Sequence, residues 1–151
     1  MERLYIAVCT DRCGDIIQQG AMMFEAQTGR HTELEWYARC EDLLYRLRET
    51  RYSAVIVDIG GAQGMEIAIG ARGIDEAVPL VWISDDEGFA LQSYRLRAKL
   101  FLVRPVDAQQ ITEALLRCAE PDPYGQAAGP QMFLAQSGFA VNKILKDGQG
   151  V

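Results

Sequence analysis

The sequence predicts an α/β protein in which a parallel sheet is covered by helices on both faces. Short apolar runs rich in β-branched residues alternate along the chain with stretches of helical periodicity. The run 54–57 is apolar throughout and contains three β-branched residues, which is typical of a strand buried on both faces. Polar residues follow these runs, and in open α/β sheets the functional crevice lies outside the carboxyl ends of the strands.

The same patterns place the individual elements. Strands are expected at 4–9, 33–38, 54–57, 78–83 and 100–103, and helices at about 14–26, 41–49, 65–71 and 89–97, with a last helix after Asp107. Asp107 has the character of an N-cap and Gly29 that of a residue ending the first helix. Residues 60–64 are expected to form a flexible loop. One face of the first helix is expected to contain Ile16, Ile17, Gly20, Met23 and Phe24.

The composition changes after the last predicted helix. Residues 1–120 are expected to form the folded domain, and the prolines and glycines of 121–130 indicate a linker. Residues 131–151 form a C-terminal extension, in which 131–136 and 139–145 flank Ser137-Gly138. This pattern is compatible with a β-hairpin or with a poorly ordered tail.

Composition excludes several classes of function. The formal net charge of -6 argues against a broad basic surface for nucleic acid. No apolar run is long enough to cross a bilayer, and the N-terminus does not resemble a signal peptide. The four cysteines show no CxxC spacing and no grouping with His31, so we expect reduced structural thiols in a cytoplasmic protein. No GxGxxG or P-loop follows a predicted strand, which disfavours a nucleotide-binding enzyme.

Four polar residues lie just past predicted strands, and they suggest a phosphoryl-transfer site. They are Asp11, Asp58, Ser84 and Arg104, and they converge only if the sheet is doubly wound with the first strand central. Carboxylate and carbonyl oxygens are ligands suited to Mg²⁺, and a carboxylate can be a nucleophile towards phosphorus. The Ser84 hydroxyl and the Arg104 cation would then bind phosphoryl oxygens.

At these positions the chain resembles the receiver domains of bacterial two-component response regulators, over about Arg3–Glu120. The resemblance is carried by the runs IAVCTD (6–11), SAVIVD (53–58), VPLVWIS (78–84) and FLVRPVD (101–107), in the family's order and near its spacing. The run ALQSYRLRA (90–98), which leads into Phe101, is most similar to receivers that precede LytTR-type DNA-binding domains.

The resemblance implies a doubly wound, flavodoxin-like fold with five parallel strands in the order 2-1-3-4-5. It implies that Asp58 accepts a phosphoryl group from a sensor histidine kinase, with Mg²⁺ held by Asp11, Asp58 and the Gly60 carbonyl. Ser84 and Phe101 would be the switch residues, with Ser84 and Arg104 completing the catalytic set. Such a domain is a phosphoacceptor rather than a conventional enzyme.

The resemblance also implies partners. Such receivers commonly form homodimers through the fourth helix, fifth strand and fifth helix, and act in transcriptional regulation. DNA would be contacted only through an output domain, of which residues 131–151 are either the opening or an independent extension. No membrane partner is expected.

Three departures from the family pattern support an alternative. Thr10 stands where the family usually has a second acid, Arg104 replaces the usual lysine, and the loop after Asp58 is short and lacks the Met-Pro step. The alternative is a pseudo-receiver, a protein-interaction module that is not phosphorylated. In that case Arg104 would be a structural ion-pair partner of Asp58. Independently of this alternative, Ser84 also fits a helix cap and Phe101 a core residue. Residues 85–87 are expected to form a solvated helix entry, and Trp36 and Trp82 are expected to be packing residues.

Overall fold

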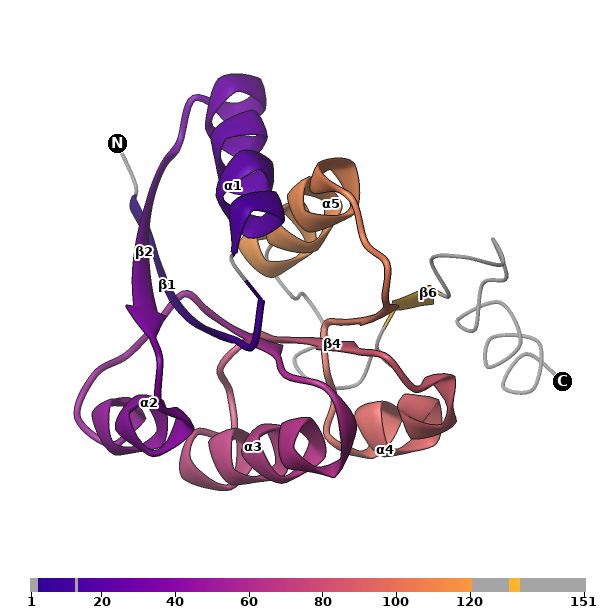
Figure 1. The fold of residues 1–151 in the computed structure, drawn as a ribbon. Helices are drawn as coiled ribbons and strands as arrows, with labels where there is room; N and C mark the ends of the chain where they lie inside the picture. Colours follow the sequence, from indigo (N-terminus) through magenta and orange to yellow (C-terminus); the bar gives the residue numbers. More distant parts are fainter. Residues whose placement is uncertain (1–2, 13, 121–130, 134–151) are drawn as a thin grey trace, which may run out of the picture.

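The computed structural model describes residues 3–12, 14–120 and 131–133, which form a sheet between two layers of helices (Figure 1). All strand pairs are parallel and follow the order β2-β1-β3-β4-β5-β6. The predicted order 2-1-3-4-5 is therefore confirmed, with β6 added beside β5. The strands are β1 (Arg3–Thr10), β2 (His31–Tyr37), β3 (Ala54–Asp58), β4 (Leu80–Ser84), β5 (Leu100–Val103) and β6 (Gln131–Phe133).

The helices lie on both faces of the sheet, as predicted. Figure 1 shows α1 and α5 on one face and α2, α3 and α4 on the other. The helices are α1 (Asp15–Thr28), α2 (Cys40–Leu47), α3 (Gly61–Ile74), α4 (Ala90–Arg95) and α5 (Ala108–Ala119), and a 3-10 turn, η1 (Glu87–Phe89), precedes α4.

The core has two parts because side chains along each strand alternate between the faces. Ile56, Leu102 and Phe24 belong to the cluster under α1 and α5, whereas Val57 and Phe101 belong to the cluster under α2, α3 and α4. This alternation continues to the strand ends. The even-numbered positions of β1, β3 and β5 point towards α1 and α5, so Thr10, Asp58 and Arg104 are directed to the same side of the sheet.

Helix α1 buries three of the five residues expected on its inner face. Ile17, Gly20, Ala21 and Phe24 are buried, while Ile16 and Met23, which were expected on the inner face, are exposed. Helix α1 packs closely on α5 at Gly20, where a Cβ would lie 2.4 Å from Ile111. Gly29 ends the helix with a φ of 74°, which confirms its predicted role.

Helix α3 corrects the prediction of a loop at 60–64 and a short helix at 65–71. It begins at Gly61 and continues to Ile74. Gly64 lies inside the helix, where a Cβ would be 1.9 Å from the carbonyl oxygen of Ile59. The glycine therefore allows close packing of the helix on the end of β3, rather than flexibility.

Smaller boundary differences occur elsewhere. Residues 78–79 precede β4, which instead includes Ser84, and the helix expected at 89–97 is divided into η1 and a short α4. Helix α2 ends at Leu47. The predicted N-cap of α5 is confirmed: Asp107 and Gln110 form a capping box, with bonds of 2.8 and 2.9 Å.

A buried arginine joins α3 to the segment between α4 and β5. The Arg72 guanidinium donates hydrogen bonds to the carbonyl oxygens of Leu96 (2.8 Å), Asp75 (3.1 Å), Glu76 (3.0 Å) and Arg97 (3.3 Å). Burial lowers the pKa of Arg72, with Arg97 adding to the effect. The carbonyl contacts satisfy the buried cation in place of a carboxylate.

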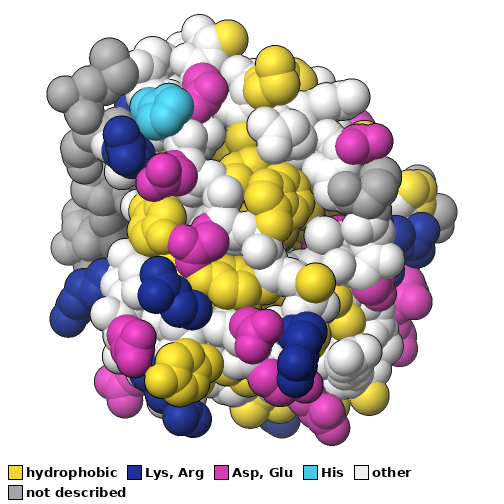
Figure 2. All heavy atoms as spheres, turned by 60° about the vertical axis from the view of Figure 1, so that its left-hand side comes forward, with side chains coloured by type: hydrophobic (Ala, Val, Ile, Leu, Met, Phe, Trp, Pro, Cys, Tyr) yellow, Lys and Arg dark blue, Asp and Glu magenta, His cyan; other side chains and the backbone are white. Residues whose placement is uncertain are grey.

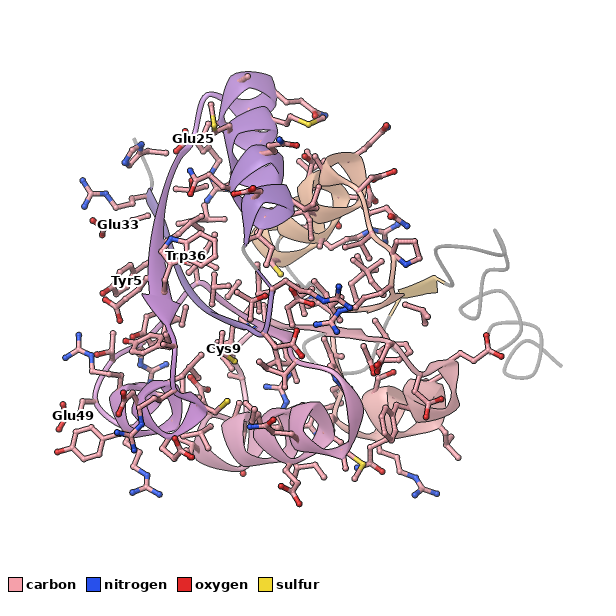
Figure 3. All side chains as sticks on the ribbon, in the orientation of Figure 1. Tyr5, Cys9, Glu25, Glu33, Trp36 and Glu49 are labelled. Atoms are coloured by element: carbon pink, nitrogen blue, oxygen red, sulfur yellow. The ribbon has the colours of Figure 1, made fainter. Side chains whose placement is uncertain are left out.

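The two tryptophans differ in exposure to solvent. Trp82 on β4 is fully buried between Phe89 and Phe101, with ring centroids 5.5 and 5.2 Å away. Trp36 on β2 is 42% exposed, and Figure 3 shows it beside the start of α1. Its ring lies over Gly14, whose φ of 81° and closeness to the ring leave no room for a Cβ.

Cys9, Cys40 and Cys118 are free thiols, and burial raises the pKa of Cys118 to about 12. Cys13 lies outside the described residues, as do 121–130 and 134–151, so the linker and hairpin stay predictions. Among the described residues, no helix is long and apolar enough to span a membrane.

Candidate functional site

Asp58, the last residue of β3, lies at the centre of a polar site at the carboxyl ends of the strands. It pairs in register with Thr10 on β1 and Ile83 on β4, and its side chain is only 9% exposed. The Thr10 hydroxyl donates a hydrogen bond of 2.7 Å to Asp58 Oδ2. The residue that sequence analysis treated only as a missing acid is therefore a direct partner of the central carboxylate.

Arg104 occupies the space between the two carboxylates of the site. Its Nη2 group lies 2.7 Å from Asp58 Oδ1, 2.6 Å from Asp11 Oδ1 and 2.9 Å from the Asp58 carbonyl oxygen. Its Nε donates a further bond of 3.1 Å to Asp58 Oδ1. Burial lowers the pKa of Arg104, but the bonds and charges of Asp58 and Asp11 outweigh burial and raise it. Arg104 is thus a permanent cation bound to both acids.

Asp11 is the more exposed of the two acids. Its second oxygen, Oδ2, accepts a hydrogen bond of 2.9 Å from the Gly60 N–H group. Burial alone would raise the pKa of Asp11, but this bond and the Arg104 guanidinium lower it overall. The Gly60 backbone therefore contacts Asp11 through its N–H, whereas its carbonyl, the expected metal ligand, accepts from Gly64 N at 3.4 Å.

Asp85 is a further acid at this end of the sheet, in the segment expected to be a solvated helix entry. The Gly61 N–H donates to Asp85 Oδ1 at 3.1 Å, and this bond is the main reason that the pKa of Asp85 is lowered. A Cβ on Gly60 would lie 3.1 Å from both Asp85 Oδ2 and Arg104 Nη1. Gly60 thus leaves room for an acid and a cation to approach its backbone.

The two predicted switch residues lie on the opposite side of the sheet. Ser84 is fully buried, and its hydroxyl accepts from the Asp86 N–H at 3.2 Å. Within the described residues, no hydrogen bond joins Ser84 to Asp58 or to the Arg104 side chain. Phe101 is fully buried against Trp82 in the core cluster. The structure therefore brings Asp11, Asp58, Gly60 and Arg104 together. Ser84 and Phe101 lie on the other side of the sheet from this group.

A cleft of about 410 Å³ lies beside Asp58 and Arg104. The start of α1 and the segment after β5 form its walls, which include Ile16, Pro105 and Val106. Small-molecule sites in proteins commonly have volumes in this range. The cleft is the route by which a molecule would approach the Asp58 carboxylate from solvent.

The side chains, as they are arranged, do not fit Mg²⁺. The ion prefers octahedral coordination by carboxylate and carbonyl oxygens. Here Arg104 Nη2 already binds Asp11 Oδ1, Asp58 Oδ1 and the Asp58 carbonyl, so a cation between the acids would lie against the guanidinium. In the part of the chain that the structure describes, no cluster of three or more His, Cys, Asp or Glu side chains could hold a metal ion.

A second polar cluster, which no sequence pattern predicted, lies at the β2 edge of the sheet. The hydroxyls of Tyr5, Tyr37 and Tyr52 all donate to Glu35, and Arg46 Nε lies 3.9 Å from the same carboxylate. Burial and the bond to Glu35 raise the pKa of Tyr52. Figure 2 shows this side of the molecule, where hydrophobic side chains are surrounded by acidic and basic ones. The cluster joins β1, β2, α2 and the segment before β3.

No protein-family model matches the chain, and no curated protein matches it. Solved structures do. A CheY-like response regulator receiver domain from Methanospirillum hungatei JF-1 has a TM-score of 0.60 at 13% identity, over 76% of this chain and 92% of that one. The BeF3-activated receiver domain of DrrB from Thermotoga maritima has a TM-score of 0.60 at 18% identity, over 80% and 100%.

A third similar structure is the response regulator TrrA from Thermotoga maritima in complex with Mg²⁺-BeF. Its TM-score is 0.56 at 16% identity, over 78% of this chain and 99% of that one. These structures show that the chain has the flavodoxin-like fold of response regulator receiver domains. The similarity to LytTR-type receivers in particular stays a prediction.

Proposed function

We propose that the chain is a receiver-type signalling module that binds partner proteins without being phosphorylated. One observation carries this proposal: both oxygens of the Asp58 carboxylate are already bound by groups of the chain itself. Thr10 donates to Oδ2, and Arg104 donates twice to Oδ1. A nucleophilic carboxylate oxygen directs a lone pair at phosphorus, and these charge-assisted bonds stabilise the anion and make both oxygens weaker nucleophiles.

The proposal is also supported by Arg104, which occupies the position expected for Mg²⁺ between the two acids. Phosphoryl transfer is catalysed mainly by cations that neutralise charge and position the reacting groups. Arg104 supplies a cation, but it holds the acids rather than leaving them free for Mg²⁺. The module would then act through its surface. The exposed Leu91 on α4 lies on the face by which we expect a homodimer or another partner to bind.

The test is incubation with acetyl phosphate and Mg²⁺, followed by intact mass spectrometry. We expect no added phosphoryl group on the wild type or on Asp58→Asn. A phosphorylatable receiver treated in parallel shows that the donor is active. Light scattering with and without Mg²⁺ and beryllofluoride should give the same molar mass. Addition of one phosphoryl group to the wild type only would overturn the proposal.

A second candidate function is a phosphoacceptor receiver in transcriptional regulation, and the cleft favours it. The cleft reaches Asp58 from solvent, so a phosphodonor has a route to the carboxylate. In this case Arg104 would have to release the two acids for Mg²⁺ before Asp58 accepts a phosphoryl group from a sensor histidine kinase, and Ser84 and Phe101 would respond as switch residues. Phosphorylation of the wild type in the experiment above would establish this candidate in place of the first.

A further inference from the structure

Arg104 is longer than the lysine expected from the receiver pattern, and its extra reach changes what it contacts. A lysine presents one ammonium point charge, whereas the planar guanidinium presents several donors in a fixed geometry. In this chain the guanidinium binds one acid through Nε and Nη2 and reaches the other acid through Nη2. One nitrogen thus lies within 2.9 Å of three oxygens, two from carboxylates and one from the backbone.

We propose that the Arg104 guanidinium is a built-in cation that replaces a divalent metal ion between Asp11 and Asp58. This inference rests on the proposed function and explains it at the level of one side chain. The three oxygens around Nη2 are of the types that bind a hard cation. Because the cation is covalently attached, the site is complete in any concentration of Mg²⁺.

The surroundings of Arg104 hold it in this position. Its side chain is 11% exposed, and the backbone N–H group of Arg104 donates to the Ser84 carbonyl at 2.8 Å. The remaining oxygens of the two acids are bound elsewhere, Asp58 Oδ2 by Thr10 and Asp11 Oδ2 by the Gly60 N–H. The acids therefore cannot turn to accept a metal without losing these bonds as well.

Removal of the guanidinium should expose the metal-binding character of the acids. In Arg104→Gln, Asp58 would remain buried without a counter-charge, and we expect Tm to fall by about 10 °C. Mg²⁺ could then enter between the acids and stabilise the variant. At a concentration of about ten times its dissociation constant, Mg²⁺ should raise Tm by about 5 °C.

The experiment is thermal unfolding of the full chain in a Mg²⁺ titration, with NaCl added to keep ionic strength constant. Binding of Mn²⁺, measured by water-proton relaxation, provides a direct second readout. We expect the Tm of the wild type to be independent of Mg²⁺, and the Tm of Arg104→Gln to rise with it. Arg117→Gln, which removes the surface bond to Glu113, is the matched control and should not respond to Mg²⁺. Arg104→Lys replaces Arg104→Gln if the latter does not fold, and should bind Mn²⁺ where the wild type does not.

Two results would overturn the inference. One is Mn²⁺ binding by the wild type as tight as that by the Arg104 variant. The other is an Arg104 variant that folds but neither binds Mn²⁺ nor gains stability from Mg²⁺. Both results are separate from the phosphorylation test, because a chain that binds metal can still fail to accept a phosphoryl group.

Discussion

The hydroxyl of Thr10 and the carboxylate of Asp58, which are paired across β1 and β3, are joined by a hydrogen bond of 2.7 Å. The same hydroxyl accepts the Arg12 N–H at 3.0 Å, so it connects the loop after β1 to the end of β3. Thr10 is thus both a donor to a buried acid and an anchor for the segment that begins the cleft.

This relationship predicts the effect of removing one hydroxyl. Thr10→Val keeps the shape of the side chain but leaves Asp58 Oδ2 without its donor, so we expect a loss of about 1–3 kcal/mol in the free energy of unfolding. Thr10→Ser retains the hydroxyl and should lose less. Urea unfolding measures both. Equal stability of Thr10→Val and the wild type would contradict the importance of this bond.

Stability should fall in acid partly through Asp11. Its folded-state pKa is lowered, with the Gly60 bond and Arg104 overcoming the effect of burial. The stabilisation it provides is therefore complete above the unfolded pKa of about 4 and is lost as pH falls through the lower folded pKa. Urea midpoints of the wild type and Asp11→Asn should differ at pH 7 and converge below about pH 4. A constant difference at all pH values would contradict this assignment.

Two glycines in α3 should respond oppositely to alanine. A Cβ on Gly64 would overlap the Ile59 carbonyl, so Gly64→Ala should cost at least about 3 kcal/mol or prevent folding. In the part of the chain that the structure describes, no atom would lie within 4 Å of a Cβ on Gly73, so Gly73→Ala should stabilise the helix by about 0.5–1 kcal/mol. Thermal unfolding of the pair tests both. Tolerance of alanine at Gly64 would show that α3 does not pack as described.

The Arg72 contacts predict a local effect as well as a global one. A lysine cannot reach four carbonyl oxygens, so Arg72→Lys should lower stability by about 2–3 kcal/mol. Amide hydrogen exchange should accelerate most at residues 96–99, because Leu96 and Arg97 carry two of the four carbonyl groups. Arg48→Lys, on the surface of the molecule, should change stability by less than about 0.5 kcal/mol. Unchanged exchange at 96–99 would argue against the link from α3 to the segment between α4 and β5.

The fold could be predicted from the sequence because the predicted strands are short apolar or alternating runs separated by helical stretches. The apolar runs identified the strands of the parallel sheet, and the alternation along β3 and β5 directs Asp58 and Arg104 to one side. The N-cap of α5 was equally readable, because Asp107 and Gln110 have the spacing of a capping box. These features are local, so each of them can be predicted from one short stretch of sequence.

Other features depend on distances that no local pattern reveals. Gly64 was interpreted as flexible because the Ile59 carbonyl comes close to it only once the chain turns from β3 into α3. Ile16 and Met23 are apolar, so periodicity alone could not show that α1 turns a different face to α5. The cluster around Glu35 combines residues from three elements, and the donor role of Thr10 needs the register of β1 against β3.

The contrast between Trp36 and Trp82 gives the protein two separate optical reporters. Trp82 is buried in the core, and its indole N–H has no hydrogen-bond partner among the described residues, so its emission should be blue-shifted and resistant to iodide. Trp36 is open to solvent at the start of α1, so iodide should quench it selectively. Fluorescence can therefore follow events at the β2 edge and in the core beneath η1 and α4 within one unlabelled sample.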